Sequence, residues 1–186
     1  MTIYLDYQAT TPLAPEALAA MRPWLEAGFG NPHSPHRPGR QAAAAVAVAR
    51  DQVATALGRP GGRLLFTSGA TEAANLALKG AAWAAPRGRT RLVALATEHA
   101  CVLDSVRWLG AHGYEAVVLP VGADGLVDLD RVRAAVDDRT ILVAAMLVNN
   151  EIGVIQPVTE IAAIARAAGA LFFCDAVQGL GRLPLP

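Results

Sequence analysis

The stretch Leu171-Phe172-Phe173-Cys174-Asp175-Ala176-Val177-Gln178 places four apolar residues directly before an acidic one. A run this short and this apolar is typical of a strand buried on both faces of a sheet. The strand would then end at a carboxylate, with an amide side chain a few residues further on. A carboxylate next to so apolar a run needs a cation or strong hydrogen-bond donors. The end of this strand is therefore a candidate binding site, although Asp175 alone could equally cap the following turn.

Earlier apolar runs repeat the pattern, and helices are expected between them. The expected strands are 64–67, 92–96, 116–119, 141–145 and 171–174, and the expected helices lie near 72–84, 102–112, 129–136 and 159–168. Short apolar strands that alternate with helices predict an α/β fold, in which a three-layer arrangement covers a parallel sheet with helices on both faces. Residues 1–60 differ in character, because they hold a short extended start, two helices (Pro15–Ala27 and about Arg40–Leu57) and a loop rich in Gly, Pro and His. We expect this N-terminal segment to be distinct from residues 61–186, which carry the sheet.

Composition excludes several classes of protein. Hydrophobic residues make up 53% of the chain and charged residues 17%, which indicates a globular protein. The formal net charge is zero, so no field directs the chain to nucleic acid or to a membrane surface. The two cysteines, Cys101 and Cys174, form neither a metal-binding spacing nor a disulfide framework. That usage fits a cytoplasmic protein in a reducing compartment, without a metal site.

Parallel sheets bind ligands beyond the carboxyl ends of their strands, and polar motifs follow several of the expected strands. After the first strand, the sequence S-G-A-T-E at 68–72 opens a helix. Gly69 lets an anion approach the backbone, and Ala70 and Thr71 would then cradle a phosphate at the helix N-terminus. The alternative is an ordinary helix cap.

The other motifs suit an aromatic coenzyme. His99, in T-E-H, could lie flat on an aromatic ring and move protons near neutral pH, or it could cap a helix. Asn150, in N-N-E-I-G, could donate to a phenolic ring oxygen, or it could belong to a turn. Asp175 could pair with a protonated pyridine nitrogen and keep the ring an electron sink, and Gln178 could donate to the ring oxygen. Together these positions predict a pocket for pyridoxal 5'-phosphate.

The motifs in this order resemble the cysteine desulfurases of the class V aminotransferase group. The matching segments are Y-L-D-Y-Q-A-T-T-P at 4–12, F-G-N-P-H-S at 29–34, G-A-T-E at 69–72, T-E-H at 97–99, N-N-E-I-G at 149–153 and D-A-V-Q-G-L-G at 175–181. The resemblance spans the chain and corresponds to the N-terminal half of the family. It implies a fold-type-I pyridoxal-phosphate enzyme that converts L-cysteine to L-alanine. The sulfur would leave as a persulfide for iron–sulfur cluster assembly or transfer-RNA thiolation.

The resemblance also implies a role for each matching position. Ala70 and Thr71 would contact the phosphate, and His99 would stack on the ring. Asn150 and Gln178 would bond the ring oxygen, while Asp175 would pair with the ring nitrogen. His99, Asp175 and Gln178 would be the catalytic residues. His36 matches a family histidine in the G-N-P-x-S-x-H segment, whereas His33 replaces a residue that is usually small.

Two family features have no counterpart in this sequence. The family's S-x-H-K motif supplies the lysine that holds the coenzyme covalently, and a later loop supplies the sulfur-accepting cysteine. The only lysine here, Lys79, lies within a predicted helix. The resemblance therefore implies a chain that is inactive alone and needs a second polypeptide, a complementary C-terminal half. It also implies a dimer of the complete unit and a sulfur-acceptor or scaffold protein as partner.

The resemblance to the family also implies that two strands of the sheet are missing from this chain. The isolated chain would then expose sheet edges and be poorly stable. Two alternatives remain open. The chain could be half of a selenocysteine lyase or of another class V enzyme, or it could be a non-catalytic subunit that binds a desulfurase or scaffold.

Overall fold

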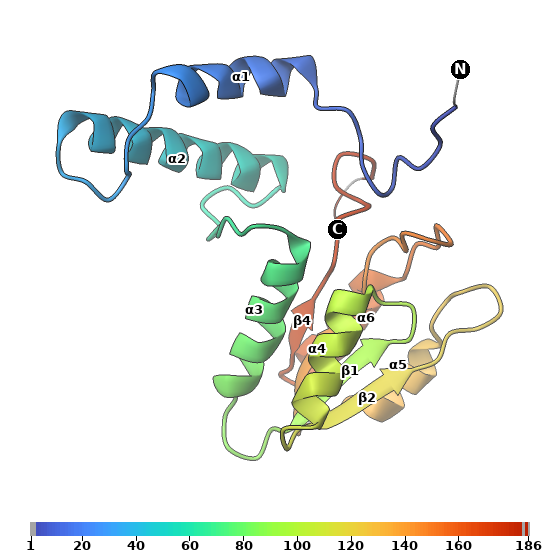
Figure 1. The fold of residues 1–186 in the computed structure, drawn as a ribbon. Helices are drawn as coiled ribbons and strands as arrows, with labels where there is room; N and C mark the ends of the chain where they lie inside the picture. Colours follow the sequence, from blue (N-terminus) through green and yellow to red (C-terminus); the bar gives the residue numbers. More distant parts are fainter. Residues whose placement is uncertain (1–2, 184, 186) are drawn as a thin grey trace. The chain divides into compact units, whose positions relative to one another are not determined.

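The computed structural model describes residues 3–183 and 185, and the chain divides into two compact units, Met1–Leu65 and Phe66–Pro186. The first unit holds helices α1 (Pro15–Glu26) and α2 (Arg37–Ala56), drawn in blue and cyan in Figure 1. Both predicted helices are therefore present, and α2 begins earlier than expected because His36 caps it. The His36 Nδ1 accepts a hydrogen bond of 3.3 Å from the backbone of Gly39.

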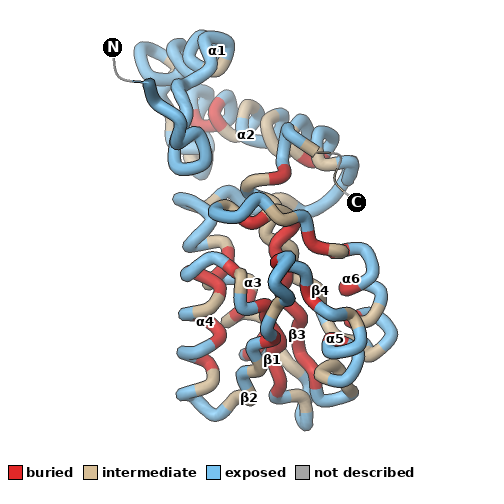
Figure 2. The backbone as a smooth tube through the Cα atoms, turned by 90° about the vertical axis from the view of Figure 1, so that its right-hand side faces the viewer, coloured by how far each residue is buried: buried red, intermediate tan, exposed pale blue. Residues whose placement is uncertain are grey.

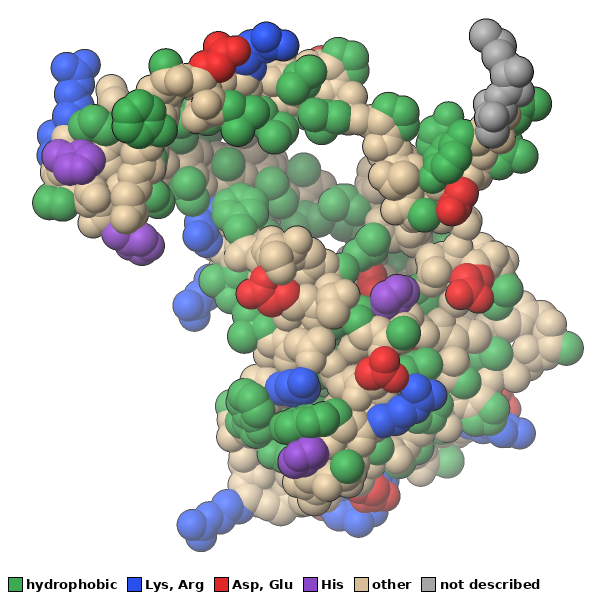
Figure 3. All heavy atoms as spheres, in the orientation of Figure 1, with side chains coloured by type: hydrophobic (Ala, Val, Ile, Leu, Met, Phe, Trp, Pro, Cys, Tyr) green, Lys and Arg blue, Asp and Glu red, His purple; other side chains and the backbone are tan. Residues whose placement is uncertain are grey.

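Most of the first unit is exposed, as the pale-blue tube of α1 and α2 in Figure 2 shows. Helix α1 has no buried residue, and hydrophobic side chains gather along it in Figure 3. They include Met21 and Trp24, which are 46% and 45% exposed. Gly39 is one of the buried residues of α2, and a Cβ there would lie 2.2 Å from the carbonyl oxygen of Ser34. The G-N-P-H-S-P-H loop can therefore close onto α2 only over a glycine.

The second unit is a parallel sheet covered by helices on both faces. Its strands lie in the order β2-β1-β3-β4, and all neighbours pair in parallel. The strands are β1 (Arg91–Leu95), β2 (Glu115–Leu119), β3 (Thr140–Ala144) and β4 (Leu171–Phe173). The helices are α3 (Ala70–Trp83), α4 (Ala100–Gly110), α5 (Leu129–Ala135) and α6 (Val158–Ala167). Helices α3 and α4 pack on one face and α5 and α6 on the other, so the predicted α/β fold class is confirmed.

The two central strands, β1 and β3, are buried along their whole length, as their uniformly apolar sequences predict. Alternate residues point to opposite faces. Val93 and Val143 pack with Ile161 of α6, whereas Ala94 and Leu142 pack with α3 and α4. The sheet therefore has two apolar cores, one on each face, and these cores hold the carboxyl ends of the strands in fixed register.

The strand predicted at 64–67 is wrong. These residues have no regular secondary structure, and Leu65 and Phe66 are 67% and 53% exposed. A strand forms only where another strand supplies backbone partners, and β1–β4 pair only with one another. Strand β4 lies at one edge of this sheet, and its Leu171 is 57% exposed. An apolar sequence alone did not reveal which strands have neighbours.

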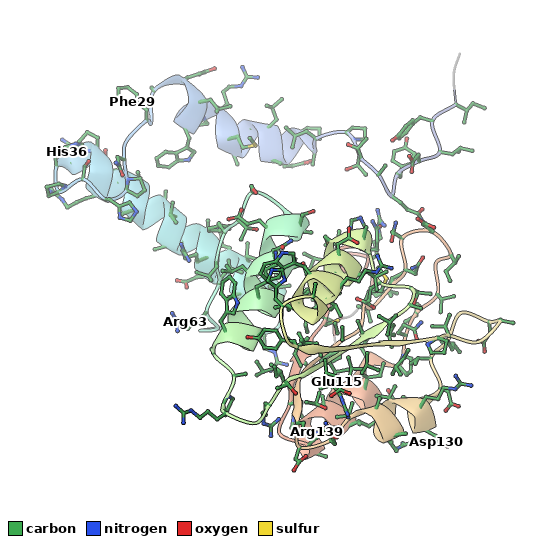
Figure 4. The ribbon with its side chains drawn as sticks, turned by 60° about the horizontal axis from the view of Figure 1, so that its bottom comes forward. Phe29, His36, Arg63, Glu115, Asp130 and Arg139 are labelled. Carbon is green, nitrogen blue, oxygen red and sulfur yellow. The ribbon has the colours of Figure 1, made fainter. Side chains whose placement is uncertain are left out.

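A charged cluster ties the amino ends of the strands together. The nearly buried Arg91 forms ion pairs of 2.9 Å with Glu115 and 2.8 Å with Asp137. Arg139 faces the same two carboxylates, at 3.6 and 3.2 Å, and Figure 4 shows it beside Glu115. The cluster links β1 to β2 and to the turn that precedes β3.

Replacing Arg91 by alanine is expected to destabilise the sheet by about 2 kcal/mol, because two carboxylates lose their most buried partner. The matched control is Arg107→Ala, which removes a fully solvated pair with Asp104 and should cost less than about 0.5 kcal/mol. Urea unfolding measures both. An equal loss of unfolding free energy in the two variants would contradict a structural role for the Arg91 cluster.

Among residues 3–183 and 185, no helix is both long enough and apolar enough to cross a membrane.

Candidate active site

The segments that follow β1, β3 and β4 are bonded to one another beyond the ends of the strands. The amide of Leu147 donates to the backbone oxygen of Asp175 at 2.9 Å, which continues the pairing of β3 with β4. The Asn149 side chain donates to the backbone oxygen of Thr97 at 2.7 Å, which links the turn after β3 to the turn after β1. The predicted site residues therefore come from segments with fixed relative positions.

The start of α3 provides free backbone donors. The first intrahelical bond runs from Ala73 N to Gly69 O, so the amides of Ala70 and Thr71 have no acceptor within the helix. Gly69 itself is extended and gives the helix no side-chain cap. Glu72 turns back, and its Oε2 accepts from the amide and the hydroxyl of Ser68, each at 2.7 Å. These two hydrogen bonds lower the pKa of Glu72. Ala70 and Thr71 are exposed, as a phosphate cradle requires.

His99 caps α4, which is one of the two roles considered from the sequence. Its Nδ1 accepts a hydrogen bond of 3.2 Å from the amide of Cys101. A neutral ring that accepts at Nδ1 carries its proton on Nε2. The cap therefore fixes both the position of the exposed ring and the nitrogen that holds the proton.

The two adjacent amides Asn149 and Asn150 have different surroundings. Asn149 is buried, and its Oδ1 accepts from the amides of Glu151 and Ile152, both at 2.8 Å. Its side-chain nitrogen Nδ2 donates to the backbone oxygen of Thr97. Asn150 is half-buried, and its side chain makes no hydrogen bond within the described residues. Asn149 thus holds the turn, and Asn150 is the amide available to a ligand.

Asp175 and Gln178 lie in the turn after β4. Asp175 Oδ1 accepts from the amide of Val177 at 3.0 Å, so the carboxylate does cap its turn while its side chain stays half-buried. The oxygen Oε1 of Gln178 accepts from Arg182 Nη1 at 2.8 Å. The arginine thereby orients the Gln178 amide, a contact that the sequence did not indicate.

Several of these residues act on Cys101. Burial raises the pKa of the Cys101 thiol, the negative charge of Asp175 raises it further, and a hydrogen bond with the Thr71 side chain lowers it. The amide of the same cysteine is capped by His99. Thr71, His99 and Asp175, which belong to different motifs, therefore all act on Cys101 at the carboxyl edge of the sheet. This is the edge where the parallel-sheet rule places a ligand.

A further acidic residue, Glu98, belongs to this cluster and was not singled out from the sequence. It is only 5% exposed, and its Oε1 accepts from the amide of Met146 at 2.7 Å. Burial raises the pKa of Glu98 to about 7, against the hydrogen bond from Met146, and the charge of Asp175 adds to the rise. The available signal was an acid two positions after the expected apolar strand at 92–96, a weaker form of the signal that identified Asp175.

Lys79 and Cys174 each have defined surroundings. The Nζ of Lys79, the only lysine in the sequence, lies 4.6 Å from the centroid of the Trp108 ring, in a cation–π contact between α3 and α4. Burial, together with the charges of Glu98 and Asp175, raises the pKa of Cys174 to about 11, so this thiol stays protonated.

The sequence profile of the class-V aminotransferases matches residues 3–186. The chain belongs to the class-V aminotransferase family. Within this family, the chain is 45% identical to the cysteine desulfurase IscS of Rickettsia akari (strain Hartford), over all of this chain and 45% of that protein. It is 44% identical to the cysteine desulfurase IscS of Rickettsia massiliae (strain Mtu5) over the same shares. The chain thus spans about half the length of the curated relatives it matches, and that half is the N-terminal one.

Solved structures of class-V relatives share the fold. A NifS-like protein superposes with a TM-score of 0.94 at 34% identity, over 99% of this chain and 51% of that chain. The protein SspA, solved in complex with cysteine, gives a TM-score of 0.92 at 34% identity, over 99% of this chain and 53% of that chain. The resemblance drawn from the sequence motifs is confirmed, and so is the correspondence to one half of a longer protein.

Proposed function

We propose that this chain forms the coenzyme-facing half of a pyridoxal-phosphate cysteine desulfurase, an enzyme that converts L-cysteine to L-alanine and passes on the sulfur as a persulfide. The observation that carries the proposal is the pair of hydrogen bonds that link the segments after β1, β3 and β4 at the carboxyl edge of the sheet. Leu147 N donates to Asp175 O at 2.9 Å, and Asn149 Nδ2 donates to Thr97 O at 2.7 Å. Curated relatives named cysteine desulfurases support the reaction, and a solved relative in complex with cysteine supports cysteine as the substrate.

The residues present fit the coenzyme at several places. The free amides of Ala70 and Thr71 suit a phosphate, because helix N-termini bind anions through such groups. The side chain of Asn150 is a donor that no described residue uses, which suits a ring oxygen. Asp175 supplies a carboxylate for a ring nitrogen, and Gln178 lies in the same turn for the ring oxygen. When bound, pyridoxal phosphate supplies an electron sink for bonds next to the amino-acid nitrogen.

The protein side chains have distinct tasks in this proposal. Asp175 keeps a proton on the group it faces, because its carboxylate stabilises a cation next to it. The Nδ1 of His99 is held by the α4 cap while the residue is exposed, so His99 can carry a proton at one defined atom, Nε2. Asn150 and Gln178 orient the ring, and Thr71 adds a hydroxyl to the phosphate site.

The covalent lysine and the sulfur-accepting cysteine would come from a complementary half, meaning a polypeptide that corresponds to the C-terminal half of the curated relatives. Lys79 makes a cation–π contact with Trp108, Cys101 is buried, and the thiol of the half-buried Cys174 stays protonated. The exposed apolar residues of the second unit would contact that half, since β4 is the last strand of the sheet that the described residues form. They include Phe66, Leu171, Val177 and Leu180. Chain and complementary half together are called the assembled enzyme below.

The wider setting is part of the same proposal. We place the assembled enzyme in the cytoplasm as a dimer of the complete unit. It would deliver persulfide sulfur to an acceptor or scaffold protein, for iron–sulfur cluster assembly or for thiolation of transfer RNA.

Mixing tests the proposal. We expect this chain, the complementary half and pyridoxal phosphate to give a yellow complex that releases sulfide from L-cysteine when a thiol is present. Neither polypeptide should do so alone. The readouts are visible absorbance, sulfide and alanine.

Two results would count against the proposal. Turnover by this chain alone would refute the division of the active site between two polypeptides. A stable complex that forms without coenzyme binding would favour a non-catalytic subunit.

A further inference from the structure

Glu98 is buried in a position that leaves half of its carboxyl group unsatisfied. It is 5% exposed and lies in the turn that follows β1. Its Oε1 accepts from the amide of Met146 at 2.7 Å, while its Oε2 has no hydrogen-bond partner among the described residues. A buried carboxylate oxygen without a donor is costly, and binding a proton lowers that cost because it removes the buried charge.

The same short segment holds Glu98 and Asp175. The amide of Met146 donates to the Glu98 side chain, and the next amide, that of Leu147, donates to the backbone oxygen of Asp175. The two acidic residues thus lie on either side of the end of β3. The charge of Asp175 acts on Glu98 in the direction that favours a proton on Glu98.

The other titratable groups around Glu98 do not offset this effect. Cys174, at the end of β4, is a protonated thiol whose own pKa is raised by burial and then by Glu98. The pKa of Cys101, at the start of α4, is likewise raised by burial and by the charge of Asp175. His99 follows Glu98 in the chain and uses Nδ1 as an acceptor for the α4 cap. No ion pair holds Glu98 in its charged form within the described residues.

We propose that Glu98 is a positioning residue of the coenzyme site, whose buried carboxyl holds a proton while Asp175 is unpaired and releases it when a cation binds beside Asp175. This inference rests on the proposed function, because the cation is the protonated ring of pyridoxal phosphate. The proton leaves Glu98 for solvent, and no other group changes its covalent state. Glu98 itself touches neither the coenzyme nor the reacting atoms; it acts through Asp175 and the segment at Met146 and Leu147.

Linkage between proton binding and coenzyme binding determines whether protons are taken up or released. In the free protein, burial and the charge of Asp175 keep the pKa of Glu98 at about 7. A cation beside Asp175 cancels part of that negative charge, so the pKa of Glu98 falls and a fraction of a proton is released near pH 7. Below about pH 5 Glu98 stays protonated in both states, and the release disappears.

The experiment is calorimetric titration of the apo form of the assembled enzyme with pyridoxal phosphate, in two buffers of different ionisation enthalpy. The difference between the buffers gives the number of protons exchanged. Wild type, Glu98→Gln and the exposed control Glu160→Gln are compared at several pH values. Glutamine keeps the acceptor for Met146, so E98Q should bind the coenzyme within about threefold of wild type.

We expect wild type and E160Q to release more protons than E98Q near pH 7, with no difference below about pH 5. Carbon-13 labelling of the glutamates should also show Glu98 titrating near neutrality in the free protein and lower in the complex. Equal proton release by wild type and E98Q would overturn the role of Glu98 and leave the proposed function intact. Failure of wild type to bind the coenzyme at all would overturn both.

Discussion

Replacing Asp175 by alanine is expected to lower sulfide release from L-cysteine by the assembled enzyme about 100-fold or more. The change removes the carboxylate that would face the ring nitrogen, and leaving one member of a partly buried charge pair without its partner costs about 3 kcal/mol. Since about 1.4 kcal/mol corresponds to a factor of ten in rate, the loss should exceed two orders of magnitude.

Two further variants separate charge from structure at this position. Asp175→Asn keeps an oxygen for the amide of Val177, which now bonds Oδ1 at 3.0 Å, but it removes the charge. We expect D175N to lose activity nearly as strongly as D175A while its urea unfolding stays near that of wild type. Asp104→Asn, an exposed carboxylate on α4, serves as the control. Activity of D175N close to wild type would show that the charge is not needed.

The second large effect concerns stability. Between pH 5 and pH 8, wild type is expected to lose roughly 2 to 3 kcal/mol of unfolding free energy relative to Glu98→Gln. The pKa of Glu98 is raised from 4.5 to about 7 by burial first, with Asp175 adding to the rise. A raised folded-state pKa means that the folded state holds the proton more tightly than the unfolded state. The stability it contributes is complete below about pH 4.5 and is lost as the pH rises through about 7.

Chemical unfolding at a series of pH values measures this difference in the assembled enzyme. Glu160→Gln, on the exposed side of α6, should follow the wild-type curve. Parallel curves for wild type and E98Q would mean that Glu98 is ionised in the folded state throughout, and the cost of its burial would then need another explanation.

Much of the fold could be predicted from local sequence. The runs at 92–96 and 141–145 match the fully buried strands β1 and β3, because strands covered on both faces have no polar positions. The run at 64–67 looks the same but forms no strand. Its outcome depends on which strands lie beside it, and that information is not contained in the segment.

The candidate site could be predicted only in part, because the role of a side chain also depends on the segments that lie beside it. The sequence N-N contains two identical side chains, and only the fold shows that Asn149 is used up in its turn while Asn150 is available. His99 and Asp175 each fill the structural role considered as an alternative, as helix cap and turn cap, and they still act on the same cysteine. Capping and coenzyme binding therefore do not exclude each other. The acid of T-E-H could not be predicted as a site residue, because its role depends on the burial of Glu98, which the segment alone does not determine.

The most direct test of the division of labour is borohydride reduction of the assembled enzyme with bound coenzyme, followed by mass spectrometric mapping of the reduced pyridoxyl label. We predict a label on a lysine of the complementary half and none on Lys79, whose ammonium group faces Trp108. A label on Lys79, together with sulfide release by this chain alone, would contradict the account.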